Sequence, residues 1–215
     1  MIPGAYIQAW SAKAPWPDAR QLEQAGHSMH LVFKFAPEAE PQATLKLKVE
    51  INTREHDSLL GIRIYPFALA NDWYEGVADV ASFEPEEIFG TKLRALLQRR
   101  KNRDLFDLHR GLEQIAIDPE KLIACFEHYL ALEGNFITRA VAEQRILEKL
   151  TRSLTEDIGP LLAAGVRFSD DDAMLAFESV WTQLIARING DPWKLTEKVV
   201  EELRTKRYPE LLQRK

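Results

Sequence analysis

Alternating apolar and polar positions characterise the first third of the chain. In "TLKLKVEINT", residues 44–53, Leu, Val and Ile alternate with Lys, Glu and Asn. A period of two is typical of a strand with one apolar face. The same reasoning predicts a strand over residues 29–36 and strand-like segments over residues 61–69 and 75–83.

Two short helices are expected before the first strand, over residues 5–13 and 18–26, because the prolines of "APWPD" break any longer helix. After residue 84 the apolar spacing becomes helical. The helices expected there cover residues 84–100, 103–114, 118–132, 138–154, 171–188 and 192–208. The sequence therefore predicts an α+β fold, in which a small mixed or antiparallel sheet with flanking helices, residues 1–100, is followed by a helical domain, residues 101–215.

Composition narrows the class of protein. The 215 residues are 46% hydrophobic, which is enough for a sizeable core. The formal net charge of -5 means that any contact with a polyanion has to come from a local basic patch. The single cysteine, Cys125, lies on the apolar face of an expected helix and is interpreted as a buried structural thiol. No apolar run reaches the roughly 18 to 20 residues of a membrane span, so we expect a soluble cytoplasmic protein.

The strongest local patch is "KLRALLQRRKNRDLFDL", residues 92–108, where six basic residues surround Asp104 and Asp107. Asn102 is expected to cap the second of two helices. The free amide groups and the dipole at such a helix start favour a bound phosphate. A spacing of three puts the two aspartates on one face of that helix.

The same patch has two interpretations that residue types alone do not separate. Lys92 and Arg99, seven positions apart on the preceding helix, suit the binding of phosphate. Alternatively, Arg103 and its acidic neighbours form a network of salt bridges.

Glu50 is a second candidate, because it shares the polar face of its strand with Lys46 and Lys48. Magnesium chemistry on nucleotides needs carboxylates held rigidly beside cations. A solvated sheet face explains the same pattern. The histidines form no His-Cys or His-x-x-x-His ligand set.

Several stretches together resemble one family, the AbiEii/AbiGii toxin family of bacterial nucleotidyltransferases. They are "MIPGAYIQAW" with "APWPD" and "LEQ", "LKLKVEINTREH", "GTKLRALLQRRKNRDLFDL" and "DIGPLL". The resemblance implies a core of the DNA polymerase β type, truncated here, followed by a helical domain. It also implies the toxin half of an abortive-infection toxin-antitoxin system, which moves a nucleotide from a nucleoside triphosphate to an RNA acceptor such as tRNA. Mg²⁺ and a cognate antitoxin are the implied cofactor and partner.

The resemblance also implies a set of site residues. Glu50 would be a catalytic carboxylate and a metal ligand. The candidates for holding the triphosphate are Lys92, Arg99 and Arg103. The acidic members of the helical motif, also taken as catalytic, are Asp104 and Asp107.

One family motif is not found in the sequence. A Gly-Gly or Gly-Ser turn followed by Asp-x-Asp should lie between "LEQ" and "HLVFKF", where only "AGHSMH" stands. The chain therefore resembles a member with an internal deletion. Because two-metal phosphoryl transfer uses those paired carboxylates, we expect activity to be impaired.

Three readings follow from the missing motif. In an active toxin, a carboxylate such as one in "REHD", residues 54–57, would replace the lost pair. A non-catalytic remnant would still bind nucleotide, RNA or an antitoxin. The third reading is a degraded gene product. The deletion is also expected to uncover sheet edges and favour association.

Overall fold

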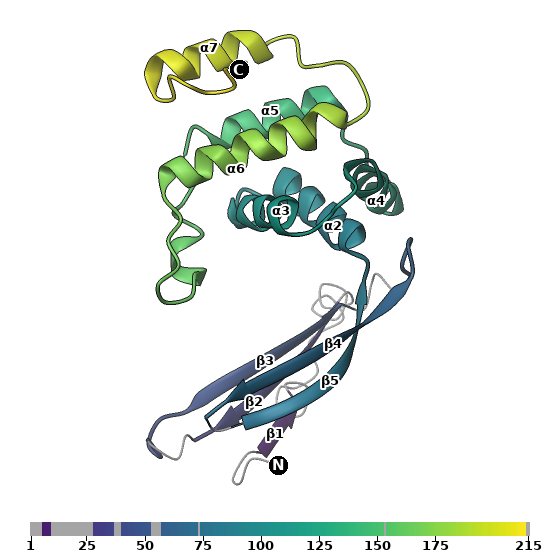
Figure 1. Cartoon of the computed structure of the whole chain (residues 1–215), viewed down its shortest axis with the longest axis vertical. Helices are drawn as coiled ribbons and strands as arrows, with labels where there is room; N and C mark the ends of the chain where they lie inside the picture. The colour runs from purple at the N-terminus through teal and green to yellow at the C-terminus, as the bar shows by residue number, and fades with distance from the viewer. Residues whose placement is uncertain are drawn as a thin grey trace, which may run out of the picture. The chain divides into compact units, whose positions relative to one another are not determined.

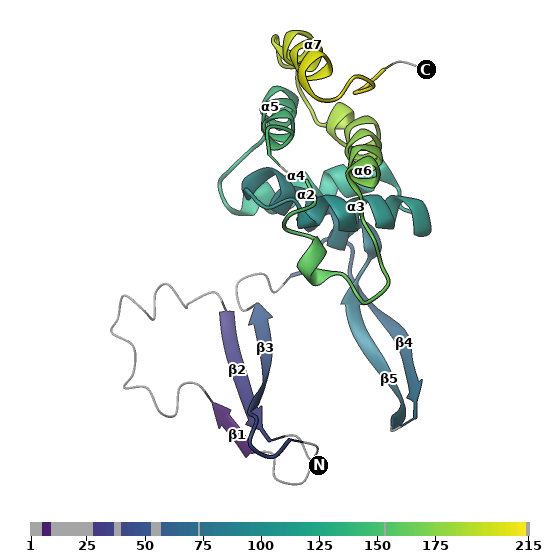
Figure 2. The same cartoon turned by 90° about the vertical axis from the view of Figure 1, so that its left-hand side faces the viewer.

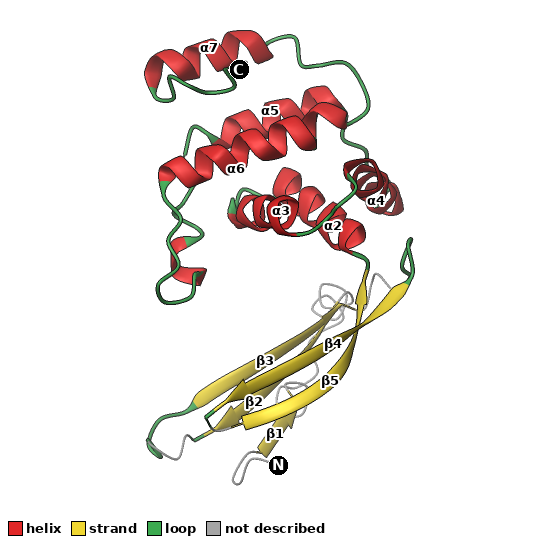
Figure 3. Cartoon of the chain, in the orientation of Figure 1, coloured by secondary structure: helices red, strands yellow, loops and turns green. Residues whose placement is uncertain are grey.

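A computed structural model of the chain describes residues 6–9, 28–36, 40–52, 57–72, 74–152 and 154–213. Among these residues, the strands precede residue 84 and the helices follow it (Figures 1 and 3). This arrangement confirms the predicted α+β class, with antiparallel strands. The strands form two separate sheets, of three strands and of two.

The first sheet consists of β1 (Tyr6–Ala9), β2 (Ser28–Phe35) and β3 (Leu45–Asn52), in the order β1-β2-β3. Both pairings are antiparallel, and Glu50 of β3 lies opposite His30 of β2. The alternation of apolar and polar residues thus predicted β2 and β3 to within one or two residues at each end.

The helix predicted over residues 5–13 is wrong in its first half, because Tyr6–Ala9 is a strand. These residues pair with β2 from Tyr6↔Lys34 to Ala9↔Leu31. Helix propensity is a weak preference in a segment this short, and the backbone hydrogen bonds of a neighbouring strand override it. The helix predicted over residues 18–26 lies outside the described residues.

The second sheet is a hairpin of β4 (Ile62–Asn71) and β5 (Tyr74–Phe83). The strands pair from Ile62↔Phe83 to Asn71↔Tyr74, and Asn71 Oδ1 accepts the backbone N–H of Tyr74 at 2.9 Å. Most of the hairpin's side chains are exposed, large apolar ones included. The predicted tendency to associate stays a prediction.

All six helices expected after residue 84 are present; α3 has the bounds that the sequence pattern predicts, and the other five end earlier or begin later than their patterns. They are α2 (Pro85–Gln98), α3 (Arg103–Gln114), α4 (Pro119–Leu132), α5 (Arg139–Lys149), α6 (Asp170–Gln183) and α7 (Thr196–Lys206). Two short 3-10 helices, η2 (Gly159–Leu161) and η3 (Ile185–Arg187), lie before and after α6.

The core of this part of the chain is helical. α2 packs against α3 and α4, α3 packs against α6, and α5 packs against α7. Figures 1 and 2 show α2, α3 and α4 directly after the hairpin and α7 at the far end. Fully buried core side chains include Leu93, Leu96, Phe126, Ile146 and Phe177. The helices that carry the basic patch are therefore firmly positioned.

A buried carboxylate secures the start of α2. Glu87 accepts the backbone N–H groups of Leu59 at 2.8 Å and of Leu60 at 3.1 Å, and the hydroxyl of Tyr129 donates to it from α4. Burial of a carboxylate is costly unless donors of this kind surround it. Glu87 thus ties the segment before the hairpin to two helices.

The chain packs as two compact units, residues 1–58 and 59–215. The first holds β1, β2 and β3, and the second holds the β4–β5 hairpin and all the helices described here. This boundary differs from that of the predicted domains, residues 1–100 and 101–215, and their division stays a prediction.

Candidate functional site

The basic patch centres on the turn between α2 and α3, residues 99–102. The backbone N–H of Arg99 still donates to Ala95 at 2.9 Å, which closes the last turn of α2. Asn102 occupies the cap position predicted for it, but its side chain makes no capping hydrogen bond. Its own backbone N–H donates to Asp157 Oδ2 at 3.2 Å. A carboxylate from a loop distant in the sequence thus already accepts a hydrogen bond from one of the backbone N–H groups at the start of α3.

Lys149, which the sequence reasoning did not select, holds this turn in place. Its Nζ donates to the carbonyl oxygens of Arg99 at 2.8 Å and of Lys101 at 3.1 Å. The side chain is nearly buried, and burial lowers its pKa to about 8, although the nearby carboxylates of Asp104 and Asp157 act in the opposite direction. A cation beside the carbonyls at a helix end also balances the helix dipole.

Lys92 and Asp107 form an ion pair between α2 and α3. Lys92 Nζ lies 2.6 Å from Asp107 Oδ2, and the two side chains are 32% and 41% exposed. This contact matches the salt-bridge interpretation of the patch, with Lys92 rather than Arg103 as the cation. In this conformation the ammonium group of Lys92 is engaged by a carboxylate.

Asp104 has a different environment from Asp107, although they are three residues apart on α3. It is only 6% exposed, and its Oδ2 has no hydrogen-bond partner among the described residues. Its charge acts on Lys149, whereas Asp107 contacts Lys92. The two aspartates therefore face different neighbours, one inside the unit and one at its surface.

Arg99 and Arg103 are exposed at either end of the turn. Neither guanidinium takes part in an ion pair within the described part of the chain. Both remain open to an anion from solution.

Glu50, the candidate metal ligand, lies in the other compact unit. Its backbone is in β3 opposite His30, and its side chain lies outside what the structure describes. Among the described residues, no three His, Cys, Asp or Glu side chains are grouped to hold a metal ion.

A pocket of about 670 Å³ opens beside the turn. Its walls come from the end of α2, the loop between α4 and α5, and the end of α5 with the residues after it. Five cationic side chains line it, Arg99, Arg100, Arg145, Lys149 and Arg152, against a single acidic one, Glu148. Sequence reasoning stopped at Arg103 and missed the second half of this cluster. The available signal was the spacing of four between Arg145 and Lys149 on an expected helix, with Arg152 three residues further on.

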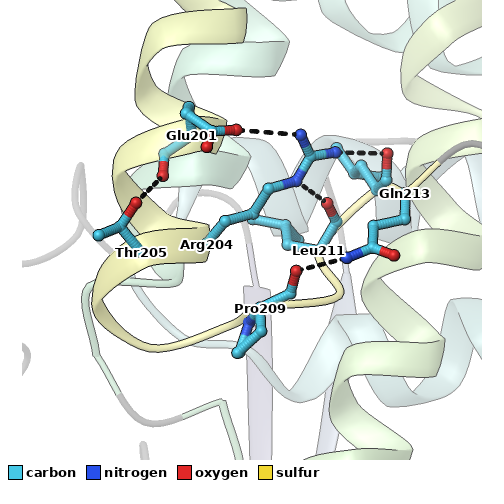
Figure 4. A network of polar contacts seen from close by, with 7 residues as sticks. Glu201, Arg204, Thr205, Pro209, Leu211 and Gln213 are labelled. Carbon is cyan, nitrogen blue, oxygen red and sulfur yellow. Dashed lines mark hydrogen bonds and ion pairs between the residues drawn. The ribbon is translucent and has the colours of Figure 1, made fainter.

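A second hollow, of about 1460 Å³, lies between α5 and α7. One of its two arginines, Arg204, is already used within the chain (Figure 4). Arg204 donates to the carbonyl of Leu211 at 2.7 Å and of Leu212 at 2.8 Å, and lies 3.3 Å from Glu201. This network stabilises the segment after α7 and leaves that cation no role toward a ligand.

Cys125 is fully buried, as expected for a structural thiol. Burial, with a smaller contribution from Glu87, raises its pKa to about 11, so the reactive thiolate is scarce near neutral pH. Within the described residues, no helix combines the length and the apolar character that a bilayer crossing requires.

Comparison with known proteins gives one finding. A family model described as nucleotidyl transferase AbiEii toxin, type IV toxin-antitoxin system, matches residues 6–208. The matched range contains every strand and helix described above. Comparison with curated proteins gives no match, and comparison with solved structures gives none either.

Proposed function

Because the chain belongs to the AbiEii family of nucleotidyltransferase toxins of type IV toxin-antitoxin systems, as its motifs predicted, we propose that it transfers a nucleotide from a nucleoside triphosphate to an RNA acceptor such as tRNA. Transfer is impaired by loss of the Gly-Ser and Asp-x-Asp motif. The reaction takes place in the cytoplasm of a bacterium, and a cognate antitoxin restrains it.

The observation that carries this proposal is the exposed cationic turn at the start of α3. Arg99 and Arg103 have guanidinium groups that no carboxylate of the described residues neutralises. Guanidinium groups bind phosphate through paired, charge-assisted hydrogen bonds. These two arginines hold the triphosphate.

Lys92 is the third phosphate ligand of the proposal, and its ion pair gives it a particular behaviour. To reach a phosphate, Lys92 has to leave Asp107, to which it is bound at 2.6 Å. Binding of the triphosphate thereby frees the carboxylate of Asp107. Before substrate binds, the ammonium group of Lys92 and the carboxylate of Asp107 therefore neutralise each other in a resting state.

Mg²⁺ is the proposed cofactor, with Glu50 as its ligand from the strand unit. Magnesium takes oxygen ligands and is usually bound through one or two carboxylates together with the substrate's phosphates. Asp104 and Asp107 are the other catalytic carboxylates of the proposal. The oxygen of Asp104 that lacks a hydrogen-bond partner supports a role beyond helix packing.

The first test separates binding from transfer. Each of the four nucleoside triphosphates, radiolabelled in the α-phosphate, is mixed with bulk tRNA and Mg²⁺, and triphosphate binding is measured in parallel. Lys92→Ala should weaken triphosphate binding by about 1 to 3 kcal/mol, the loss of one charge-assisted contact. Asp107→Asn should bind triphosphate at least as tightly as the wild type but transfer less label.

Arg110 and Glu113 provide the matched control, because they form a 3.5 Å ion pair on α3 that is also partly exposed. Arg110→Ala and Glu113→Gln should leave binding and transfer unchanged. Unchanged triphosphate binding in Lys92→Ala would mean that the ion pair of Lys92 with Asp107 has only a structural role. Glu50→Ala and Asp104→Asn should abolish any transfer of label that the wild type shows.

The alternative is a non-catalytic remnant of the family that binds nucleotide, RNA or an antitoxin. The short "AGHSMH" interval favours it, because the paired carboxylates of the reaction are not found there. A folded chain that binds triphosphate but transfers no label to any tRNA would decide for this alternative.

A further inference from the structure

The cationic pocket beside the turn has more positive charge in its lining than the acidic side chains there neutralise. Arg99, Arg100 and Arg152 have no ion pair within the described residues. Glu148, the one acidic residue of the lining, is bound instead by the side-chain amide of Gln144 at 3.0 Å. In a chain of net charge -5, an uncompensated local cluster of this kind favours an anionic ligand.

An aromatic ring stands at the same pocket. Phe136 lines it and is 84% exposed, on the loop between α4 and α5. The loop has a defined conformation. Gly134, at φ 67°, ends α4 by donating to Ala131 at 2.9 Å, and Asn135 donates to Leu130 at 3.0 Å. These two bonds form the motif that terminates helices with a left-handed glycine.

The residues after the ring are fixed as well. Ile137 is buried, and the hydroxyl of Thr138 accepts the N–H of Val141 at 3.4 Å as the cap of α5. Phe136 is therefore presented to solvent between two anchored positions. A single exposed apolar residue is ordinary on a protein surface, but a fixed ring beside unpaired arginines matches the requirements of base stacking and phosphate contact.

We infer that this pocket binds an unpaired segment of RNA, with a base stacked on Phe136 and the neighbouring phosphates held by Arg100, Arg145 and Arg152. The inference rests on the proposed function, since it gives the RNA acceptor its binding site on the helical unit. The amide of Asn135 and the hydroxyl of Thr151 also line the pocket and offer hydrogen bonds to a base edge or a ribose.

The distribution of the cations favours a strand over a free nucleotide. The only nearly buried cation of the pocket, Lys149, gives hydrogen bonds to the carbonyls of Arg99 and Lys101. The four arginines of the lining, in contrast, are all exposed. Successive phosphates of a single-stranded backbone suit several exposed cations, whereas a duplex has no free base face to stack.

The test is fluorescence anisotropy of the full chain with a short labelled RNA that lacks secondary structure, without nucleoside triphosphate. Phe136→Ala should weaken binding about fivefold to a hundredfold, the range measured when a stacking ring is removed, and Phe136→Tyr should retain it. Arg152→Ala should weaken binding and reduce the slope of log K against log salt by about 0.7. The same RNA annealed to its complement should bind more weakly than the single strand.

Leu175→Ala and Arg110→Ala are the controls, because they remove an exposed apolar side chain and an exposed cation outside the pocket. Equal binding by the wild type and Phe136→Ala would overturn the inference, and so would equal binding of single strand and duplex. So would a loss of triphosphate binding in Phe136→Ala with RNA binding unchanged.

The outcomes also separate the inference from the proposed function. Label transfer by the wild type together with unaltered RNA binding by Phe136→Ala would remove the inference and leave the function. RNA binding that depends on Phe136, in a chain that transfers no label, would leave the inference and remove the proposed transfer activity.

Discussion

Lys149 shows how one side chain serves the whole patch. It is nearly buried, donates to two carbonyls of the turn between α2 and α3, and carries a charge that burial disfavours. A lysine in this position costs stability while it is protonated, but it fixes the segment from which Arg99 and Arg103 project. Its effect should therefore be visible in the pH dependence of folding.

The first prediction concerns that dependence. The pKa of Lys149 is about 8 in the folded chain and 10.5 ordinarily, so between these values the unfolded chain binds the extra proton. Stability rises with pH wherever the unfolded state binds more protons, and the gain here is at most about 3 kcal/mol. Urea unfolding at pH 7.5 and pH 10 should show this gain in the wild type but not in Lys149→Met. An equal change in both proteins would contradict the assignment.

At this scale the sequence selected candidates within residues 92–108, but it did not select Lys149 or the other cations of the pocket. Sequence spacing put Asp104 and Asp107 on one face, but the side chains face different neighbours because α2 supplies Lys92 to one and α5 supplies Lys149 to the other. Contacts between helices far apart in the chain are not encoded in local periodicity. For the same reason Phe136 was not among the residues selected from the sequence.

Individual elements were easier to predict than their contacts. β2 through β5 and α2 through α7 follow from alternation and helical spacing, since each has a long enough pattern. β1 was mistaken for a helix because its four residues take their conformation from pairing with β2. The division into two sheets depends on which strands pair, and the pattern within one strand does not specify its neighbour.

Close packing of α2 on α4 gives the second prediction. A Cβ added to Gly90 would lie 2.8 Å from Cβ of Cys125 and 3.0 Å from backbone atoms of Leu122 and Phe126. Gly90→Ala gains about 1 kcal/mol of helix propensity but costs about 1 to 3 kcal/mol of overpacking, and the rigidity of the atoms it meets favours the upper part of that cost.

The expected result is a net loss of stability by about 1 kcal/mol or more, measured by chemical denaturation. A convenient second measurement is the reaction of Cys125 with a thiol reagent, which should be faster in Gly90→Ala than in the wild type. Gly159→Ala is the control, because its added Cβ has no atom within 4 Å. Gly134→Ala is unsuitable as a control, because the positive φ of Gly134 would strain an alanine. If Gly159→Ala and Gly90→Ala lose equal stability, packing is not the cause.

For the whole molecule, charge gives the third prediction. The net charge of -5 repels RNA as a whole, so affinity depends on the few exposed arginines of the pocket. If Arg100, Arg145 and Arg152 each contact a phosphate, log K should fall with log salt with a slope of about -2. A much steeper slope would assign binding to cations elsewhere, and a flat response would remove RNA from the list of ligands.

The contacts of Glu87 have a consequence for the order in which the newly made chain can fold. The backbone N–H groups of Leu59 and Leu60 donate to the carboxylate of Glu87, which is synthesised 28 and 27 residues after them. The hydroxyl of Tyr129, which donates to the same carboxylate, follows 42 residues after Glu87. During synthesis, the start of the helical unit is therefore locked only after most of α4 has left the ribosome. A translation pause that keeps Tyr129 inside the ribosome would therefore leave Glu87 without the donor from α4.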